Sequence, residues 1–363
     1  MRNSKGCFLR RVTVGLLSFA AASLSCQAMA TAPGTEKPSI PFTTRYDALM
    51  HGGFVRAANA AITCRGADSV KKVGCAAARS GATASNGDFD MFYTDIDRDP
   101  NTYNSSSAEI RVPAGSRVTY ARLYWGGNLR VGEQKPPKDN GRVLIAEPGG
   151  AYKQVLADTV VGHRVAQGAD AYQASADVTD LVRASGSGLY TVAQLNVAMG
   201  RTAAGAWGGW TLVAAYENKA EPLRHLFLRD GFDALTREHP GKDLRVRIPV
   251  AKGASGYAGL VAYNGDRGRT GDSLTVSTGR GGPVRLSDRA NPAADVLNST
   301  ISQPGDQPRR TPAHANTLGY DSDVFALGKA LARGGGRALD LRLVSTGDPA
   351  WIGVFFGAVD ARS

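Results

Sequence analysis

The sequence predicts an all-β protein whose antiparallel sheets pack as a sandwich or jelly roll, with one or two short helices. About ten short runs in the chain alternate apolar and polar residues with period two, as half-buried strands do. The 44 glycines and 17 prolines fall largely between these runs, where turns are expected. Helical periodicity is scarce. Many short strands with few helices between them indicate sheets packed face to face.

The clearest strand patterns lie in three segments. Apolar residues alternate with charged ones over 244–250 and again over 339–343, and the run 210–216 follows a Gly-Gly pair. Each has the length and period of a strand with one buried face. The other strands that we expect, in chain order, are 109–112, 118–125, 142–146, 189–198, 223–229, 257–263, 273–278 and 351–359.

Two segments have the signals of short helices. In 177–184, Asp177 and Thr179 are residue types that cap a first turn. The segment 321–333 ends at three consecutive glycines, which commonly follow a helix C-terminus. We expect both to be helical.

The first thirty residues have the composition of a secretory signal peptide. Four cations precede an apolar stretch over 12–25, and Ala28-Met29-Ala30 is a small-x-small cleavage site, so we expect cleavage between Ala30 and Thr31. A twin-arginine signal at Arg10-Arg11 and a lipidated Cys26 are the two alternatives. We therefore expect an exported protein, extracellular or periplasmic, with a flexible lead-in over 31–44 and a β-sandwich region over 45–363. That region forms either one large domain or two packed sandwiches.

Charge and hydropathy limit the partners that we expect. Loss of the leader removes four cations and no anions, so the formal charge of +11 falls to about +7. The cations are spread along the chain, which argues against nucleic acid and favours a glycan or an anionic cell-surface polymer. No apolar run reaches the roughly 18 residues that would anchor the mature chain in a membrane.

Cysteine usage agrees with export. Beyond the leader the chain keeps only Cys64 and Cys75, an even number in a compartment that permits disulfides. A bridge between them would contribute about 2.8 kcal/mol by closing a short loop. A metal pair is the alternative, but there is no CxxC, and His51 is the only imidazole nearby.

One acidic segment has the spacing of a calcium loop. Asp95, Asp97, Asp99 and Asn101 occupy alternate positions, which is how a tight loop supplies oxygen ligands to a hard cation. The match is partial, because Pro100 stands where the sharp turn requires glycine. The segment is a candidate calcium site, with a solvated acidic turn as the alternative.

Motifs of known enzymes are missing from the sequence. It contains no GxSxG, HExxH, GxxxxGK[ST] or strand-following GxGxxG. His225 lies in an alternating run, where we expect a packed histidine. Trp125, Trp207 and Trp210 adjoin glycines; we expect them in the core, although exposed rings there could stack on sugars.

Several ordered motifs between about residue 45 and the C-terminus belong together. They are Asn104-Ser105-Ser106-Ser107-Ala108, Ala121-Arg122-Leu123-Tyr124-Trp125-Gly126-Gly127, Ala176-Asp177-Val178-Thr179, Gly209-Trp210-Thr211-Leu212-Val213, Tyr216-Glu217-Asn218, Asp230-Gly231-Phe232, Gly265-Asp266-Arg267-Gly268, Thr270-Gly271-Asp272-Ser273-Leu274 and Asn316-Thr317-Leu318-Gly319-Tyr320-Asp321-Ser322-Asp323. This succession resembles an uncharacterised module of bacterial exported and surface proteins, often the N-terminal head before repeated sandwich domains. The resemblance implies an extracytoplasmic β-rich domain and supplies no catalytic residues. The sequence ends without a sorting signal or repeat, which favours release or periplasmic residence.

We therefore expect a secreted or cell-surface protein without catalytic activity, acting in adhesion, carbohydrate binding or envelope structure. Recognition would use loops at the ends of the sandwich, including the acidic segment 88–104. The alternative is an extracellular hydrolase acting on polysaccharide through the loop carboxylates Asp266, Asp272, Asp321 and Asp323. Two carboxyl groups roughly 5 to 10 Å apart in a substrate-sized cleft would indicate the hydrolase.

Overall fold

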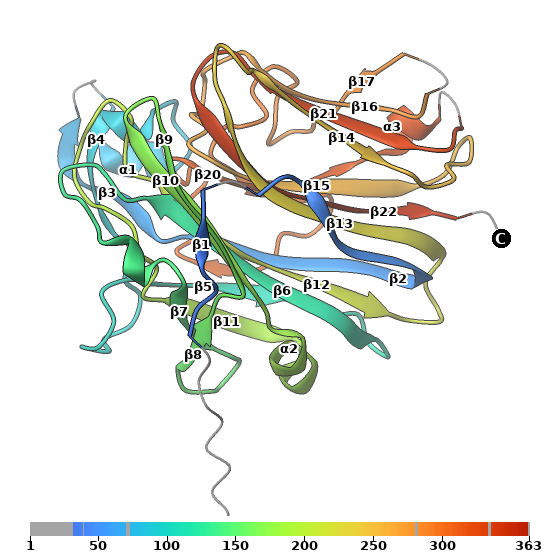
Figure 1. The fold of residues 1–363 in the computed structure, drawn as a ribbon, viewed down its shortest axis with the longest axis horizontal. Helices are drawn as coiled ribbons and strands as arrows, with labels where there is room; N and C mark the ends of the chain where they lie inside the picture. The colour runs from blue at the N-terminus through green and yellow to red at the C-terminus, as the bar shows by residue number, and fades with distance from the viewer. Residues whose placement is uncertain (1–31, 39, 70–72, 280–281, 333–334, 362–363) are drawn as a thin grey trace, which may run out of the picture. The chain divides into compact units, whose positions relative to one another are not determined.

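The fold is all-β, and the strand pairs are antiparallel apart from β1 with β9 and β18 with β20 (Figure 1). The computed structural model describes residues 32–363 except 39, 70–72, 280–281, 333–334 and 362–363. The predicted signal peptide over 1–30 and its cleavage between Ala30 and Thr31 lie outside the described residues. The predicted fold class is confirmed.

The described helices are short and lie at the margins of the sheets. The helix predicted over 177–184 is confirmed as α2 (Thr179–Ser185). The helix predicted over 321–333 is largely wrong, because β20 (Tyr320–Ala326) occupies its first part and only α3 (Gly328–Leu331) is helical. The residues of β20 from Tyr320 to Phe325 are buried on both faces, and the buried residues include Asp321 and Asp323, so the strand lacks the pattern of an apolar inner face and a polar, solvent-exposed face. The other helical segments are α1 (Cys75–Arg79) and the 3₁₀ turns η1 (Asn86–Asp88) and η2 (Pro137–Asp139).

One sheet of 11 strands runs through the molecule. Its strand order is β1-β9-β10-β6-β12-β2-β13-β22-β15-β20-β18. The bounds of the strands not yet given are β1 (Glu36–Lys37), β2 (Thr43–Ala60), β6 (Arg117–Asn128), β9 (Thr159–Ala166), β10 (Ala169–Asp177), β12 (Gly208–Glu217), β13 (Leu223–Leu235), β15 (Gly256–Tyr263), β18 (Ile301–Ser302) and β22 (Ala350–Asp360).

Strand β2 joins the two halves of this sheet. Its second part pairs with β12 from Gly52 to Ala60, and its first part pairs with β13 from Thr43 to His51. Gly52 stands at the change of partner with φ +145°, and a Cβ there would lie 1.9 Å from the carbonyl oxygen of Tyr216. Only glycine fits this close approach of two backbones. One long strand therefore belongs to both halves.

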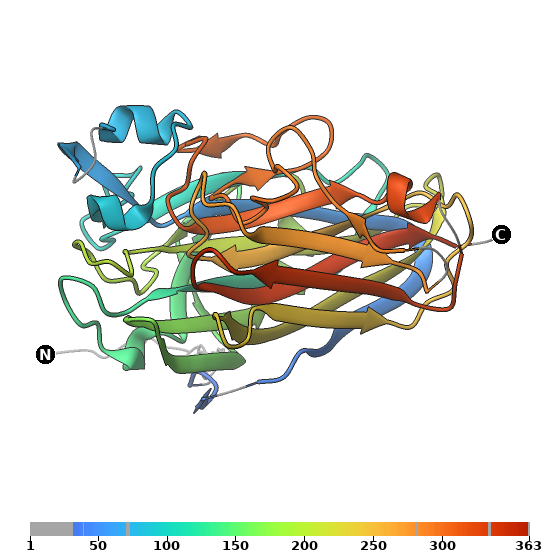
Figure 2. The ribbon, with the colours of Figure 1, turned by 90° about the horizontal axis from the view of Figure 1, so that it is seen from above.

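Smaller sheets cover the outer faces of the two halves. Figure 1 shows four layers, with β5, β7, β8 and β11 below β6 and β12, and with β14, β16 and β21 above β13, β15 and β22. From above, orange and red strands of the C-terminal part lie over much of the blue β2 (Figure 2). The five-stranded sheet has the order β19 (Arg310–Thr311), β5 (Ser105–Ile110), β11 (Gly188–Ala193), β7 (Arg142–Ala146) and β8 (Lys153–Leu156), and the four-stranded sheet has β14 (Gly241–Val246), β21 (Leu339–Ser345), β16 (Asp272–Ser277) and β17 (Val284–Arg285).

Three hydrophobic cores fill the spaces between these four layers. The first lies against the five-stranded sheet and contains Ile145 and Trp210. The second lies under the four-stranded sheet, where Leu341 packs in the same cluster as Phe355. The third lies between the two halves of the 11-stranded sheet, and its ring pairs include Trp207 with Trp351 at 4.9 Å and Phe54 with Phe356 at 5.9 Å. Offset and edge-on ring pairs of this kind stabilise a core beyond the area that they bury.

The layer in which a strand lies explains whether its sequence alternates between apolar and polar residues. In β14, Leu244 and Val246 are buried and Arg245 is exposed, as the alternation predicts for an outer strand. In β12, by contrast, nine consecutive residues are buried because sheets cover both faces. The predicted strand at 210–216 is present, but it is not half-exposed.

A fourth, two-stranded sheet carries the disulfide. It pairs β3 (Ile62–Ser69) with β4 (Phe89–Tyr93). Cys64 of β3 is bonded to Cys75 at the start of α1, with their Cα atoms 5.7 Å apart, which confirms the predicted bridge. No helix among the described residues is long and apolar enough to cross a membrane.

Candidate functional site

The predicted calcium loop lies between β4 and β5, and its acidic side chains accept hydrogen bonds from the loop itself. Asp97 Oδ1 accepts from the backbone N of Asp99 at 3.0 Å and from Oγ1 of Thr102 at 3.1 Å. Asp99 Oδ1 accepts from the backbone N of Asn101 at 2.9 Å and from its Nδ2 at 2.8 Å. Asp and Asn commonly make such turns with their own backbone. The alternating oxygens thus bind amide groups of the loop.

Two further contacts fasten this loop, one to β5 and one to the residue that precedes β8. Asp95 Oδ1 accepts from the hydroxyl of Ser105, the first residue of β5, at 2.7 Å. The hydroxyl of Tyr152 donates to Asp97 Oδ2. Burial disfavours the charged form of Asp97, but the hydrogen bonds from Tyr152 and from the loop outweigh it and hold the pKa below its ordinary value. The loop is therefore held in one shape by its own carboxylates.

The side chains that make these hydrogen bonds are the same ones that the sequence predicts as calcium ligands. Within the described part of the chain, no three Asp, Glu, His or Cys side chains are placed so that they could hold a metal ion together. The calcium site stays a prediction.

Beside this loop, two tyrosines and a lysine form a surface group that sequence reasoning missed. Tyr103 is 37% exposed, and its ring centroid lies 4.9 Å from that of Tyr93. Lys135 Nζ lies 5.3 Å from the Tyr93 centroid and 5.6 Å from the Tyr103 centroid, within the range of a cation–π contact. Lys135 comes from a distant part of the chain, and no local spacing pointed to this contact. We call Tyr93, Tyr103 and Lys135 the tyrosine platform.

The four carboxylates proposed for hydrolysis also come together, at one end of β15, β16 and β20. Asp266, Asp272, Asp321 and Asp323 are 6%, 1%, 0% and 0% exposed. Burial is the main cause of the raised pKa values of Asp321 and Asp272; the charge of Asp272 adds to the rise at Asp321, and that of Asp266 adds to the rise at Asp272. A polysaccharide cannot contact side chains that are buried to this degree. Their arrangement thus differs from the open pair that a glycosidase requires.

Two further acids, which sequence reasoning missed, complete an aspartate cluster of six. The backbone N of Asp272 donates to the carbonyl of Ala294, which places Asp295 beside it, and the charge of Asp295 raises the pKa of Asp272. The pKa of Asp348 is raised to about 8, mainly by burial and then by the charges of Asp266 and Asp272. These acids come from four separate segments, so only the fold unites them.

The aspartate cluster is only partly satisfied by hydrogen bonds. Asp323 Oδ1 accepts from the backbone N of Ser302 at 2.9 Å and from its hydroxyl at 2.7 Å. Oδ2 of Asp321, Oδ2 of Asp323 and both carboxylate oxygens of Asp272 are buried without a hydrogen-bond donor among the described residues. The nearby hydroxyl of Ser345 donates to the carbonyl of Asp348 at 2.7 Å.

Burial sets the titration of this cluster. It raises the pKa of Asp272 and of Asp323 to about 7 and that of Asp266 to about 6, because a charged carboxylate is poorly solvated in the interior. Arg269 is ion-paired with one member of the cluster, since its Nε lies 3.5 Å from Asp266 Oδ2. Near neutral pH, several of these acids therefore carry protons.

One member of the aspartate cluster, Asp348, also lines a depression at the surface. This depression has a volume of about 370 Å³, and its other lining residues include Glu238, Arg237 and Arg269.

The three tryptophans and the histidine singled out in the sequence lie in strands or directly beside one. Trp125, Trp207 and Trp210 are all 0% exposed, which confirms that they are core residues. His225 lies in β13 opposite Leu49 and Val359, and burial lowers the pKa of its imidazole. The three tryptophan rings are therefore not accessible for stacking on a sugar, and His225 is half-buried.

Part of the chain matches a known family. Residues 81–256 match the model of a protein of unknown function, DUF3344, so this span is an uncharacterised domain. The matched span contains the acidic loop and the tyrosine platform but none of the six aspartates of the cluster. No curated protein matches the sequence.

Two solved structures are similar at a low level. The major capsid protein P2 from Bacteriophage PM2 is 14% identical, with 73% of this chain and 96% of that chain covered and a TM-score of 0.20. A chain from the structure of Sulfolobus Turreted Icosahedral Virus is 10% identical, with coverages of 70% and 85% and a TM-score of 0.20. TM-scores of this size support no argument about fold or function.

Proposed function

We propose that this protein is an exported, non-catalytic binding protein that recognises glycans through the acidic loop and the tyrosine platform. Such recognition would serve adhesion or envelope structure. The observation that carries the proposal is the exposed ring of Tyr103, packed on Tyr93 beside a loop fixed by hydrogen bonds. A tyrosine ring offers an apolar face and a polar rim, which suits a ligand that is itself both apolar and polar.

The fixed shape of the loop supports this proposal. Binding by a mobile loop loses affinity because the loop must be ordered first. Here Asp97 accepts hydrogen bonds from three groups, and Asn104 both donates to and accepts from the backbone of Leu195, at 2.8 and 3.0 Å. Asp95 and Asn101 remain exposed at the same loop, where they can bond to sugar hydroxyls.

Export is the second part of the proposal. The Cys64–Cys75 disulfide is the kind of bond that persists in oxidising compartments. It agrees with the signal sequence predicted for residues 1–30, and it supports an extracellular or periplasmic location.

A glycan and cell-wall binding array tests the binding proposal. We expect Tyr103→Ala to reduce binding about tenfold or more, because truncating a tyrosine that dominates a binding site typically costs about 2 kcal/mol or more. Leu49→Ala is the matched control, since Leu49 is also exposed, at 58%, but lies on β2. Equal binding by wild type and Tyr103→Ala would refute this site, and so would an equal loss in both variants.

The hydrolase alternative has one observation in its favour. Asp348 and Glu238 line the same depression, and their pKa values are shifted in opposite directions, that of Asp348 up to about 8 mainly by burial and that of Glu238 down through its hydrogen bonds. Release of reducing ends from a polysaccharide panel, abolished by Asp348→Asn, would establish hydrolysis. We expect no release.

A further inference from the structure

Arg56 is a buried cation that forms no ion pair with a carboxylate among the described residues. It projects from β2 and is 4% exposed. Nη1 donates to the backbone oxygen of Ser322 at 2.6 Å and to its hydroxyl at 3.1 Å, and Nη2 donates to the backbone oxygen of Ser302 at 3.2 Å. Nε has no acceptor within the described residues. A buried guanidinium normally has an anionic partner, because charge is expensive to remove from water.

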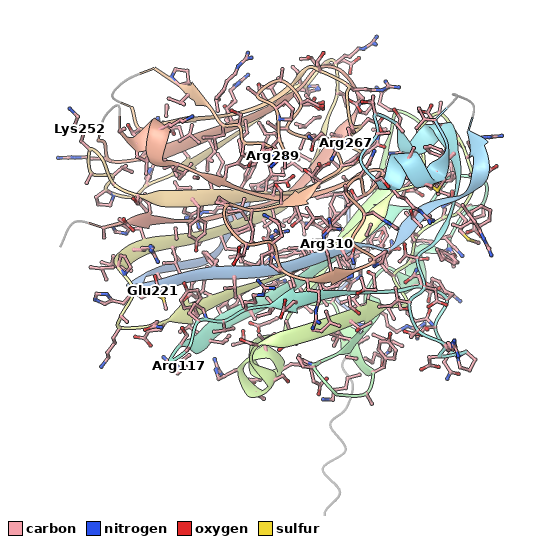
Figure 3. All side chains as sticks on the ribbon, turned by 180° about the vertical axis from the view of Figure 1, so that it is seen from behind. Arg117, Glu221, Lys252, Arg267, Arg289 and Arg310 are labelled. Atoms are coloured by element: carbon pink, nitrogen blue, oxygen red, sulfur yellow. A yellow bond between two sulfur atoms is a disulfide. The ribbon has the colours of Figure 1, made fainter. Side chains whose placement is uncertain are left out.

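A second arginine lies close to the first. Arg310 on β19 donates from Nη2 to the carbonyl of His314 at 2.8 Å, while its Nη1 is buried without an acceptor among the described residues. Arg310, which is labelled in Figure 3, lines the same small cavity as Arg56 of β2. Burial, and then the positive charge of Arg56, lower the pKa of Arg310 to about 10. Two guanidinium groups therefore share one buried region.

The charge of this region is not balanced by its own acid. Asp323 is the carboxylate whose charge acts on both arginines. Its Oδ1 is already bonded to Ser302, and burial raises its pKa to about 7. Even when Asp323 is ionised, one negative charge faces two positive ones. Among the described residues, Asp323 is the carboxylate that acts on both arginines, so one acid serves two guanidinium groups.

The two arginines line a small cavity, and Arg56 also lines a larger pocket. Both line a cavity of about 10 Å³, which has room for one small atom or group. Arg56 and Pro308 also line a neighbouring pocket of about 320 Å³, whose other walls are mostly apolar and include Phe54, Tyr257, Pro304, Val324 and Phe356. That volume is at the lower end of the range for small-molecule sites. The anionic end of a ligand could thus bind beside the arginines while its apolar body binds in the neighbouring pocket.

We propose that this protein binds a small amphipathic carboxylate, with one carboxylate oxygen in the cavity of about 10 Å³ between Arg56 and Arg310 and the rest of the molecule in the pocket of about 320 Å³. The head would accept hydrogen bonds from Arg56 Nε and Arg310 Nη1. The body would contact Phe54, Tyr257 and Phe356. Arg111 at the pocket wall pairs with Glu109 at 2.8 Å, so its charge is already balanced. This site is separate from the tyrosine platform, so either proposal can fail alone.

Calorimetric titration with octanoate tests the proposal, with 1-octanol and acetate as probes of the body alone and the head alone. We expect octanoate to bind at least about tenfold more tightly than either, because a hydrogen bond to a charged group is worth more than a factor of ten. Arg310→Gln should weaken octanoate about tenfold or more and leave octanol unchanged. The adjacent, exposed Arg309→Gln is the matched control.

A second variant tests the pocket without disturbing the buried charges. Ala326 lines the pocket and is exposed, so Ala326→Trp should fill the pocket and abolish octanoate binding while the melting temperature is retained. No detectable octanoate binding, equal affinity for octanoate and octanol, or acetate binding as tightly as octanoate would each overturn the proposal. The last result would indicate a site for a small anion only.

Discussion

The aspartate cluster predicts that this protein loses stability as the pH rises through neutrality, and Asp272 allows the size of the effect to be worked out. The pKa of Asp272 is raised from 3.8 to about 7, mainly by burial. Each pKa unit corresponds to about 1.36 kcal/mol, so a shift of about three units amounts to about 4 kcal/mol.

The sign follows from which state binds the proton more tightly. The folded state does, because its pKa lies above that of the unfolded chain. The contribution to the free energy of unfolding is therefore complete below about pH 4 and is lost as the pH rises to about 7. Asp272→Asn keeps the shape of the side chain and removes its titration. We expect the variant to gain about 4 kcal/mol relative to wild type between pH 4 and pH 8.

Urea unfolding at pH 4, 6 and 8, with the disulfide intact, measures this difference. Asp306→Asn is the matched control, because Asp306 is an exposed loop acid. For the control, we expect the pH profile to run parallel to that of wild type. If the profile of Asp272→Asn also ran parallel to wild type, Asp272 would titrate normally in the folded protein and the reasoning from burial would be refuted.

Three other predictions concern the loop, the disulfide and the shared strand. Asp97→Asn should lower the free energy of unfolding by about 1 to 3 kcal/mol, equally in millimolar calcium and in chelator, because Asp97 accepts the hydroxyl of Tyr152; a loss confined to calcium would mean that the loop acids are metal ligands. Replacing both Cys64 and Cys75 by alanine should lower the free energy of unfolding by about 3 kcal/mol. An unchanged midpoint of urea unfolding would contradict a stabilising role for the disulfide. Gly52→Ala should lower the free energy of unfolding by roughly 2 to 4 kcal/mol, because the added Cβ strains the backbone and collides with a neighbouring one. Gly149→Ala, at φ +72° with open surroundings, should lower it by less than half of that amount. Equal losses in the two variants would show that the collision at Gly52 is relieved.

The sequence and the structure agree best where a strand has one solvent-exposed face. Leu244, Arg245 and Val246 alternate in burial as predicted, because β14 lies in an outer layer. Agreement is poorest at β20, which was expected to be helical. Its residues from Tyr320 to Phe325 are buried on both faces, and the three consecutive glycines at 334–336 in the sequence resembled the signal that follows a helix C-terminus. Periodicity reports a boundary between protein and water, and an interior strand has no such boundary.

The sites follow the same division. The Asp95–Asn101 spacing was visible because its members are neighbours in the chain, and so was the Cys64–Cys75 pair. The tyrosine platform and the arginine pair were not visible, because each joins residues far apart in the sequence. The carboxylates named for hydrolysis were the right residues to group, but only their burial distinguishes an open catalytic pair from a protonated interior cluster.

By itself, the sequence determined the all-β class, the disulfide and the segments that turn, since these depend on residue type and on neighbours along the chain. The tertiary structure decided which polar groups lost their water. The aspartates and Arg56 have ordinary side chains whose unusual properties arise from the layers packed over them. Solvation depends on everything that surrounds a group, and most of what surrounds these groups comes from distant parts of the chain.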